Sequence, residues 1–344
     1  HTAALTAAGA LRGMGYEVTT KAVFDTIEVE AEAAVIQSIA LSRGVNFHYP
    51  SDERVHISFD ELTTDDDLQT VADIFAEAAG RKPKSIKRTQ QAAIAESLVR
   101  RSEILTESVF RSYRTETEMM RYIKRLEMRD ISLMNSMISL GSCTMKLNAA
   151  ALMQPLSLAG FQDMHPLVPA DQAEGYRELI ASLEGYLATI TGFAGCTLMP
   201  NSGAAGEYTG LMIIRAWHQS RGQGYRNVIL IPASAHGTNP ASAAMAGMKI
   251  VTVKCDPNGN IDVEDLKARA EEYSSELCGL MVTYPSTHGV FESRIREIVD
   301  AVHDAGGQVY MDGANMDAQV GLTNPGHIGA DVCHLNLHKT FAMP

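Results

Sequence analysis

The sequence has little of what marks membrane, secreted or nucleic-acid-binding proteins. It contains no apolar run that approaches the roughly 20 residues of a membrane-spanning helix, and no signal peptide opens it. The five cysteines are scattered, odd in number and without a C-x-x-C pair, which argues against a disulfide framework and a zinc site. No basic block is present and the formal net charge is −12, so nucleic acid is not an expected partner. We therefore expect a protein of a reducing compartment, the cytoplasm or, in a eukaryote, the mitochondrial matrix.

The composition is otherwise that of a globular protein. Hydrophobic residues make up 45% and charged residues 20% of the chain, and its 344 residues allow two domains. The sequence begins within a predicted helix and stops five residues after Lys339, a residue on which the interpretation below depends. We therefore expect the sequence to be an excerpt of a longer polypeptide.

Residues 1–85 predict a small α/β domain. Its clearest helix follows Thr64, which can cap it, while Asp65–Asp67 complement the helix dipole and Gly80 ends the helix. Residues 86–130 are first basic and polar and then helix-prone, which predicts a linker and a helical arm. The other elements predicted for the small domain are helices at 2–14 and 31–42 and strands at 23–29 and 56–59.

From residue 131 to residue 344, helices alternate with short apolar strands. Such alternation predicts an α/β domain with a mostly parallel sheet that helices cover on both faces. In open sheets of this kind ligands bind beyond the carboxyl ends of the strands, so the residues after each strand are candidates for a site. Strands are predicted at 196–199, 228–232, 250–254, 279–283, 308–311 and 332–335, and helices at 173–191, 206–220, 262–274 and 293–305.

The first candidate motif, PNSGAAGE, runs from a predicted strand into a predicted helix. Ser202, Gly203 and Ala204 can point their backbone N–H groups at an anion, and the helix dipole adds to the attraction. Small residues at such a turn are also ordinary loop geometry, so the motif alone does not distinguish an anion site from a loop.

The second motif, SAHGTNP, places His236 at the end of the next strand. Its flat ring can lie there over a flat cofactor. The alternative is a loop in which Thr238 or Asn239 caps the following helix.

The third motif, YMDGANMDAQVG, places Asp312 at the end of an apolar strand. A buried carboxylate needs a cationic partner, and a protonated pyridine nitrogen is one such partner. Gly313 and Ala314 are small enough to let a ring approach. The alternatives are a strand-end cap or a magnesium ligand, with Asn315 and Asp317 as further oxygen donors.

The fourth motif, HLNLHKTF, places Lys339 after an apolar stretch. A lysine in a dry site is available for Schiff-base chemistry, although a lone lysine after a strand is more often a surface residue. Together the four motifs supply an anion cradle, a stacking ring, a carboxylate and a lysine at one edge of a sheet. Pyridoxal phosphate (PLP) needs these partners, whereas magnesium accounts for the aspartates alone.

Six segments of the sequence resemble, in order and spacing, the glycine dehydrogenase (decarboxylating) family, the P-proteins of the glycine cleavage system. They are GSCTMKLN, PNSGAAGEY, IPASAHGTNPASA, VTYPSTHGVFE, DGANMDAQVGLT and GADVCHLNLHKTF. The resemblance is strong over residues 110–344 and weaker toward residue 1. It implies the aspartate-aminotransferase-like fold of PLP enzymes (fold type I), in two similar halves of which the second carries the lysine. This chain would then be the end of the first half, a linker, and the start of the second half's large domain.

The resemblance also implies a reaction and roles for single residues. The reaction is PLP-dependent decarboxylation of glycine, with transfer of the aminomethyl group to the lipoyl arm of the H-protein, by a full-length chain that forms a homodimer. Lys339, beside His338, would hold PLP, and Asp312 would pair with its pyridine nitrogen. The remaining implied contacts are Ala314 under the ring and His236 above it, Ser202, Gly203 and Ala204 around the phosphate, and Ser142, Cys143, Thr144, Thr287 and His288 at the entrance for substrate and lipoyl arm.

The sequence departs from the family's pattern in three ways. Residue 205 is Ala where the family reads SGAQGE, and residue 317 is Asp where it reads ANMNAQ; both changes bear on fine substrate contacts. The family continues beyond the lysine with a glycine-rich loop, a strand and a small C-terminal domain, so we expect the excerpt alone not to build a complete active site. Two other interpretations stay open, another fold-type-I decarboxylase or aminotransferase and a non-catalytic partner subunit that keeps the fold.

Overall fold

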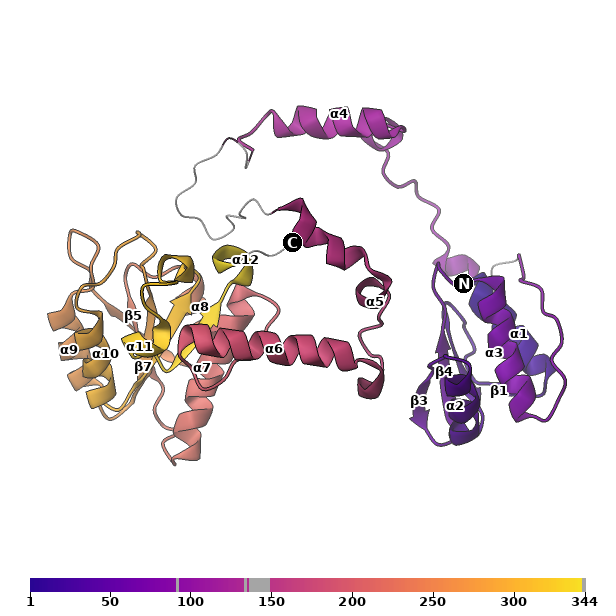
Figure 1. Cartoon of the computed structure of the whole chain (residues 1–344), viewed down its shortest axis with the longest axis horizontal. Coiled ribbons are helices and arrows are strands. Elements are labelled where there is room, and N and C mark those ends of the chain that lie inside the picture. Colours follow the sequence, from indigo (N-terminus) through magenta and orange to yellow (C-terminus); the bar gives the residue numbers. More distant parts are fainter. Residues whose placement is uncertain (91–92, 133–134, 136–148, 342–344) are drawn as a thin grey trace. The chain divides into compact units, whose positions relative to one another are not determined.

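The computed structural model describes residues 1–90, 93–132, 135 and 149–341. Within this part, no helix combines the length and the apolar character needed to cross a membrane. The chain forms two compact units, His1–Thr115 and Glu116–Pro344 (Figure 1). The boundaries at residues 85 and 130 suggested by the sequence stay a prediction.

The first unit contains a four-stranded antiparallel sheet with helices packed on one face. Successive side chains of a strand point to opposite faces, so β2 buries Ile27 and Val29 and turns Glu28 to the other face. The buried side chains pack against Leu11, Ile36 and Phe75 of the helices. The strands are β1 (Glu17–Val18), β2 (Thr26–Glu30), β3 (His48–Ser51) and β4 (Arg54–Ser58), in the order β1-β2-β4-β3, and the helices are α1 (Thr2–Gly13), α2 (Ala33–Ser42) and α3 (Asp65–Ala78).

Helix α3 begins as the sequence predicts. The backbone N–H of Asp67 donates to Thr64 Oγ1 at 3.1 Å, and the Asp67 carboxylate accepts the Thr64 N–H at 2.7 Å. This reciprocal capping box satisfies two backbone donors that the first helical turn leaves open. Strands β1 and β3 are not predicted from the sequence, because they are short and too exposed to show an apolar alternation.

The segments that separate the two sheets bury few side chains. Helix α4 (Glu116–Glu127) has no buried residue. It lies within residues 86–130, for which the linker and helical arm stay a prediction. The other elements here are the 3-10 helices η1 (Glu96–Leu98), η2 (Ser108–Arg111), η3 (Ala150–Ser157) and η4 (Ala170–Gln172) and the short helix α5 (Ala159–Gln162).

The second unit is built on a parallel sheet in the order β6-β5-β7-β8-β9, with every described strand pair parallel. This arrangement confirms the predicted α/β class. Its strands are β5 (Val228–Pro232), β6 (Lys249–Val253), β7 (Leu277–Thr283), β8 (Gln308–Gly313) and β9 (Val332–Leu335). Its helices are α6 (Glu174–Thr191), α7 (Gly203–Ser220), α8 (Thr238–Met245), α9 (Val263–Glu272), α10 (Ile295–Asp304), α11 (Pro325–Ile328) and α12 (Leu337–Thr340), with one further 3-10 turn, η5 (Met316–Ala318).

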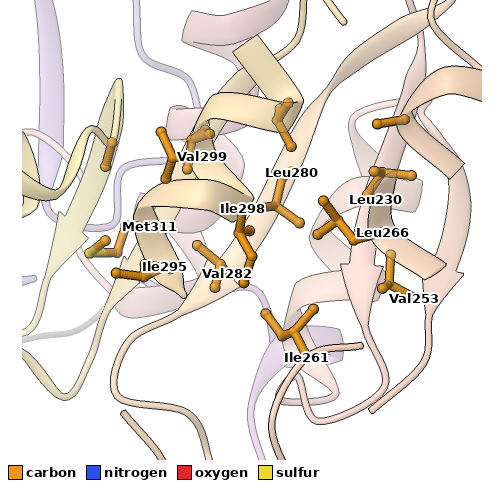
Figure 2. Packing of buried hydrophobic residues seen from close by; sticks show 14 of the residues in the cluster. Leu230, Val253, Ile261, Leu266, Leu280, Val282, Ile295, Ile298, Val299 and Met311 are labelled. Carbon is orange, nitrogen blue, oxygen red and sulfur yellow. The ribbon is translucent and has the colours of Figure 1, made fainter. Parts of the chain in front are cut away.

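Helices cover both faces of the parallel sheet, and its strands β5 and β7 are buried at every position. Leu280 of β7 packs with Leu266 of α9 and Ile298 of α10, and Figure 2 shows this cluster. The next residue, Met281, points the other way and packs with Leu211 of α7 and with α8. Because both faces are closed, polar side chains can gather only at the edges of the sheet.

One predicted strand is wrong. Residues 196–199 are irregular in the structure. The Leu198 N–H donates to the Glu184 carboxylate at 3.1 Å and the Met199 N–H donates to the Thr197 hydroxyl at 3.3 Å. Side chains therefore take the place of a neighbouring strand, and Met199 stays 86% exposed. The other strands of this unit lie within two residues of their predicted bounds.

Candidate active site

The carboxyl edge of the parallel sheet gathers the polar residues of the second unit. Asp312 stands at the end of β8, and β9, the neighbouring strand, leads into α12 with Lys339. Helices α7 and α8 begin at this edge on one face of the sheet. The buried polar side chains found here are Glu207, Asn239, Ser242, Thr283, Asp312, His334, Asn336 and Lys339.

Asp312 is 3% exposed and is held from both sides by hydrogen-bond donors. The Ala314 N–H donates to Oδ1 at 2.9 Å, and the Asn239 amide donates to Oδ2 at 3.1 Å. His334 Nε2 lies 3.6 Å from Oδ1. A carboxylate offers about four acceptor positions, so these donors leave capacity for a further cationic N–H.

His334 and Tyr310 form a buried pair beside Asp312. The Tyr310 hydroxyl lies 2.5 Å from His334 Nδ1, and the two ring planes are nearly parallel, with 6.1 Å between centroids. Burial raises the pKa of Tyr310 well above its usual value, and the nearby Asp312 and Glu207 carboxylates raise it further. The phenol therefore keeps its proton at neutral pH.

Glu207, in the first turns of α7, bridges that helix to α8. Its Oε1 accepts a hydrogen bond from the Thr238 hydroxyl at 2.8 Å, and its Oε2 accepts one from the Ser242 hydroxyl at 2.9 Å. Glu207, Asp312 and His334 each offer a ligand atom, and these atoms lie within 4.8 Å of one another. Among the described residues, this is the group that could hold a metal ion. Both Glu207 oxygens are already engaged, however, and Asp317, the magnesium ligand that the sequence suggested, is exposed and outside this group. No second feature of the described residues supports an ion here.

The amino end of α7 provides open backbone donors. Ser202 caps the helix by accepting the Ala205 N–H on its Oγ at 3.1 Å. The N–H groups of Gly203 and Ala204, in the same first turn, have no acceptor within the helix. Gly206 lies against His334, where a side-chain Cβ would come within 3.0 Å of the His334 Cβ. The small residues of this motif thus bring the open end of α7 close to β9.

His236 lies in the loop between β5 and α8 and is exposed. Its Nδ1 accepts the Thr238 N–H at 3.2 Å and lies 2.9 Å from the Thr238 hydroxyl. Since Thr238 also donates to Glu207, the orientation of the His236 ring is linked to α7. The alternative cap role for Thr238 or Asn239 is wrong, because α8 has no side-chain cap and Asn239 bonds Asp312 instead.

Lys339 is 9% exposed and is therefore not the surface lysine of the alternative interpretation. Its N–H donates to the Asn336 carbonyl at 3.0 Å, which fixes the turn that follows β9. The next residue, Thr340, has a buried hydroxyl with no partner among the described residues. A buried hydroxyl without a partner is costly, and a bound group would relieve that cost.

The remaining predicted contacts are spread around this edge. Ala314 is half-buried and bonds Asp312 through its N–H, and His338 is half-buried in α12. Thr287 is half-buried and His288 exposed, in the loop after β7. Ser142, Cys143 and Thr144 lie outside the described residues.

Glu207, Asn239, Tyr310 and His334 are among the residues of this edge that were not singled out from the sequence as site residues. The one signal available was a polar residue inside an apolar strand, since His334 lies within the predicted strand 332–335. The register that pairs Asp312 with His334 across β8 and β9 makes it a neighbour of the carboxylate, and this register cannot be read from either strand alone.

Comparison with known families and proteins gives consistent matches. Residues 79–344 match the family model described as glycine cleavage system P-protein. The chain is 57% identical over 345 residues to a glycine dehydrogenase (decarboxylating) of Christiangramia forsetii and 58% identical over 345 residues to one of Flavobacterium johnsoniae. Each match covers 100% of this chain and 36% of the relative. The chain thus spans about a third of the length of these curated relatives.

Two solved structures share the fold at low sequence identity. A crystal structure of glycine decarboxylase (P-protein) of the glycine cleavage system, in inhibitor-bound form, has a TM-score of 0.56 at 16% identity, over 80% of this chain and 57% of that chain. A sphingosine-1-phosphate lyase of Burkholderia pseudomallei has a TM-score of 0.52 at 14% identity, over 73% of this chain and 58% of that chain. These likenesses concern the fold alone. They agree with the α/β fold of PLP-dependent fold type I that the sequence predicts.

Proposed function

Because this chain belongs to the glycine cleavage system P-protein family, we propose that the protein of which it forms part decarboxylates glycine with PLP and passes the aminomethyl group to the lipoyl arm of the H-protein. The observation that carries the proposal is the placement of Lys339. This lysine is buried directly after β9, the strand next to β8, whose end bears the buried Asp312.

The residues present fit PLP in kind and in place. Lys339 would hold the cofactor through its amine, and Asp312 has acceptor capacity for a pyridinium N–H. The open N–H groups of Gly203 and Ala204, with Ser202 at the cap, would bind the phosphate at the positive end of α7. His236, exposed above the edge, would cover the ring, and Ala314 would lie beneath it. The orphan hydroxyl of Thr340 offers one more donor.

PLP, when bound, supplies an electron sink for the electron pair that carbon dioxide leaves behind on glycine. The chain's own residues prepare this step. Asp312 is buried, and the hydrogen bonds from Asn239 and Ala314 fix the orientation of its carboxyl group. Lys339 would hold PLP through its amine, and its Nζ could accept or return a proton beside the substrate. Thr238 holds the His236 ring through Nδ1 and leaves Nε2 for substrate or solvent.

The first test is spectroscopic and uses the full-length protein. Wild type with added PLP should show the absorbance of a protein imine and give a borohydride-trapped adduct on Lys339. Lys339→Ala should lose both. The matched control is Lys254→Ala, which removes an exposed lysine with 72% of its side chain accessible and should change neither. An unchanged adduct in Lys339→Ala would show that the assignment is wrong.

The second test separates glycine from other substrates of fold-type-I enzymes. Exchange of labelled bicarbonate into glycine should depend on both PLP and a lipoylated carrier protein. Exchange with a larger amino acid and without the carrier would favour a different decarboxylase or aminotransferase. An absence of both PLP binding and exchange would favour a non-catalytic partner subunit. The proposal also includes a cytoplasmic location and a homodimer. Light scattering of the full-length chain, which measures the mass of the particle, tests the homodimer.

A further inference from the structure

The buried pair of Tyr310 and His334 has no part in the roles given above, yet it lies against the carboxylate on which the proposed chemistry depends. Tyr310 is fully buried, and His334 is 8% exposed. Tyr310 lies two residues before Asp312 on β8, and His334 lies on β9, the strand that leads into α12 with Lys339. His334 pairs with Asp312 in the register between β8 and β9. Burying two polar side chains costs free energy unless their polar atoms have hydrogen-bond partners.

The protonation of the pair follows from the chemistry of its members. Tyr310 keeps its proton because burial and the neighbouring carboxylates raise its pKa. A buried phenol needs an acceptor for its proton, and the described atom within reach is His334 Nδ1 at 2.5 Å, so the hydroxyl is assigned as the donor. A histidine nitrogen that accepts a hydrogen bond carries no proton, so the proton of the neutral ring is on Nε2. That nitrogen is the one that faces Asp312 Oδ1 at 3.6 Å.

Packing leaves the His334 ring little freedom to turn away. The hydrogen bond to the Tyr310 hydroxyl fixes the ring, and the planes of the two rings lie within 12° of each other. On the side of α7, a Cβ at Gly206 would lie 3.0 Å from the His334 Cβ, and one at Gly203 would lie 3.7 Å from His334 Nε2. The absence of a side chain at Gly206 therefore makes room for His334.

We propose that His334 is a positioning residue, whose Nε2–H, oriented by Tyr310 and 3.6 Å from Oδ1, holds the Asp312 carboxylate in place for the cofactor. Asp312 then has three supports, since Ala314 and His334 face Oδ1 and Asn239 holds Oδ2. The inference rests on the proposed function, because it assigns His334 through the pairing of Asp312 with PLP. Metal sites show the same logic, where a group behind the ligand fixes its orientation and charge.

Two substitutions at position 334 separate positioning from mere packing. The side-chain nitrogen of glutamine reaches the place of histidine Nε2, whereas that of asparagine reaches only the place of Nδ1. His334→Gln should thus keep a donor toward Asp312, and His334→Asn should lose it. In the full-length apo-protein titrated with PLP, we expect His334→Asn to bind PLP on the order of tenfold more weakly than wild type. His334→Gln should stay within about threefold of wild type.

Tyr310→Phe provides a second, independent variant. It leaves the packing of the ring in place but removes the hydroxyl that sets the His334 tautomer. We expect PLP affinity between those of His334→Gln and His334→Asn, and an imine absorbance band that titrates at a different pH from wild type. Thermal unfolding of each apo-protein shows how much of any change is a loss of folding.

Each outcome bears on one of the two proposals. Equal PLP affinity for the wild type and His334→Asn would overturn the positioning role and leave the proposed function standing. Equal losses in His334→Asn and His334→Gln, matched by equal losses of thermal stability, would also overturn it, because rescue by glutamine is required. Failure of the wild type itself to form the imine on Lys339 would overturn the proposed function.

Discussion

The two sheets of this chain bury their residues in different ways. The burial pattern of each sheet determines whether its carboxylates lie on a face or at an edge. Strand β2 of the antiparallel sheet alternates between buried and partly exposed residues, whereas β7 of the parallel sheet is buried at every position. The first sheet therefore has an outer face on which charges can pair. The second has none, so its charges collect where the strands end. A carboxylate on the face of one sheet is structural, and a carboxylate at the edge of the other is available for a ligand.

Glu28 and Asp312 make this contrast concrete. Glu28 lies on the outer face of β2 and bonds Thr19, His56 and Arg54, so residues of its own unit complete its interactions. The donors to Asp312 are the amide of Asn239 and the N–H of Ala314, both neutral. A buried negative charge supported by neutral donors gains most from a cation that arrives with a ligand.

The largest expected effect tests whether both faces of the parallel sheet are packed. Leu280 and Met281 are neighbours on β7 that enter clusters on opposite faces. Leu280→Ala and Met281→Ala should each lower the free energy of unfolding by about 2–5 kcal/mol. In the antiparallel sheet, Ile27→Ala should cost a similar amount, but Glu30→Ala, an exposed residue of the same strand, less than about 1 kcal/mol.

Urea unfolding of the full-length apo-protein measures these differences. The informative comparison is between the two β7 variants, since a parallel sheet with two covered faces requires large losses for both. A small loss for either variant would contradict the packing of that face.

Much of this architecture is visible in the sequence because continuous apolar runs and helix boundaries are local signals. The runs around Val228–Pro232 and Val332–Leu335 predict strands at their observed bounds, and the edge positions of Asp312 and Lys339 follow from where those strands end. Residues 196–199 have a similar apolar character, but no strand among the described residues pairs with them. A strand needs a partner, and a short pattern does not tell whether one is present.

The site itself is less predictable, because its contacts cross between elements far apart in the sequence. Asn239 donates to Asp312 across 73 positions, and Tyr310 meets His334 across 24. Which residues meet depends on strand order and register, and neither is encoded by a single segment. The residue types of the site can be proposed from the motifs, whereas their supporting partners require the structure.

The next effect concerns the space around two glycines, one in a strand of the parallel sheet and one in a helix of the first unit. In the parallel sheet, a Cβ on Gly279 would come within 2.1 Å of the Gln308 carbonyl oxygen, so Gly279→Ala forces β7 and β8 apart. We expect a loss of about 1–3 kcal/mol in the free energy of unfolding. The control is Gly9→Ala in α1, where the new methyl meets nothing within 4 Å and should stabilise the helix by about 0.5–1 kcal/mol. Urea unfolding that gave both variants the same sign would contradict this difference.

A smaller effect compares two helix caps. Thr64 caps α3 of the first unit and Ser202 caps α7 of the second, each through its hydroxyl oxygen. Replacement of either residue by Ala should cost about 1 kcal/mol of stability, because one backbone donor loses its acceptor. Ser202→Ala should in addition weaken PLP binding, whereas Thr64→Ala should leave it unchanged. Thermal unfolding and PLP titration of the full-length protein measure the two effects separately, and unaltered PLP affinity in Ser202→Ala would remove Ser202 from the phosphate site.

The smallest expected effect is the pH dependence of the Glu28 contacts. The hydrogen bond from Thr19, followed by that from His56 and by Arg54, lowers the pKa of Glu28 from 4.5 to about 2. Because the folded-state pKa is depressed, the contacts stabilise the protein fully above about pH 4.5, and this contribution is lost as the pH falls toward 2. The thermal midpoints of wild type and Glu28→Gln should therefore differ most at neutral pH and converge on acidification. A difference that stayed constant from pH 6 to about pH 3 would mean that the carboxylate charge contributes nothing and that Glu28 acts through neutral hydrogen bonds alone.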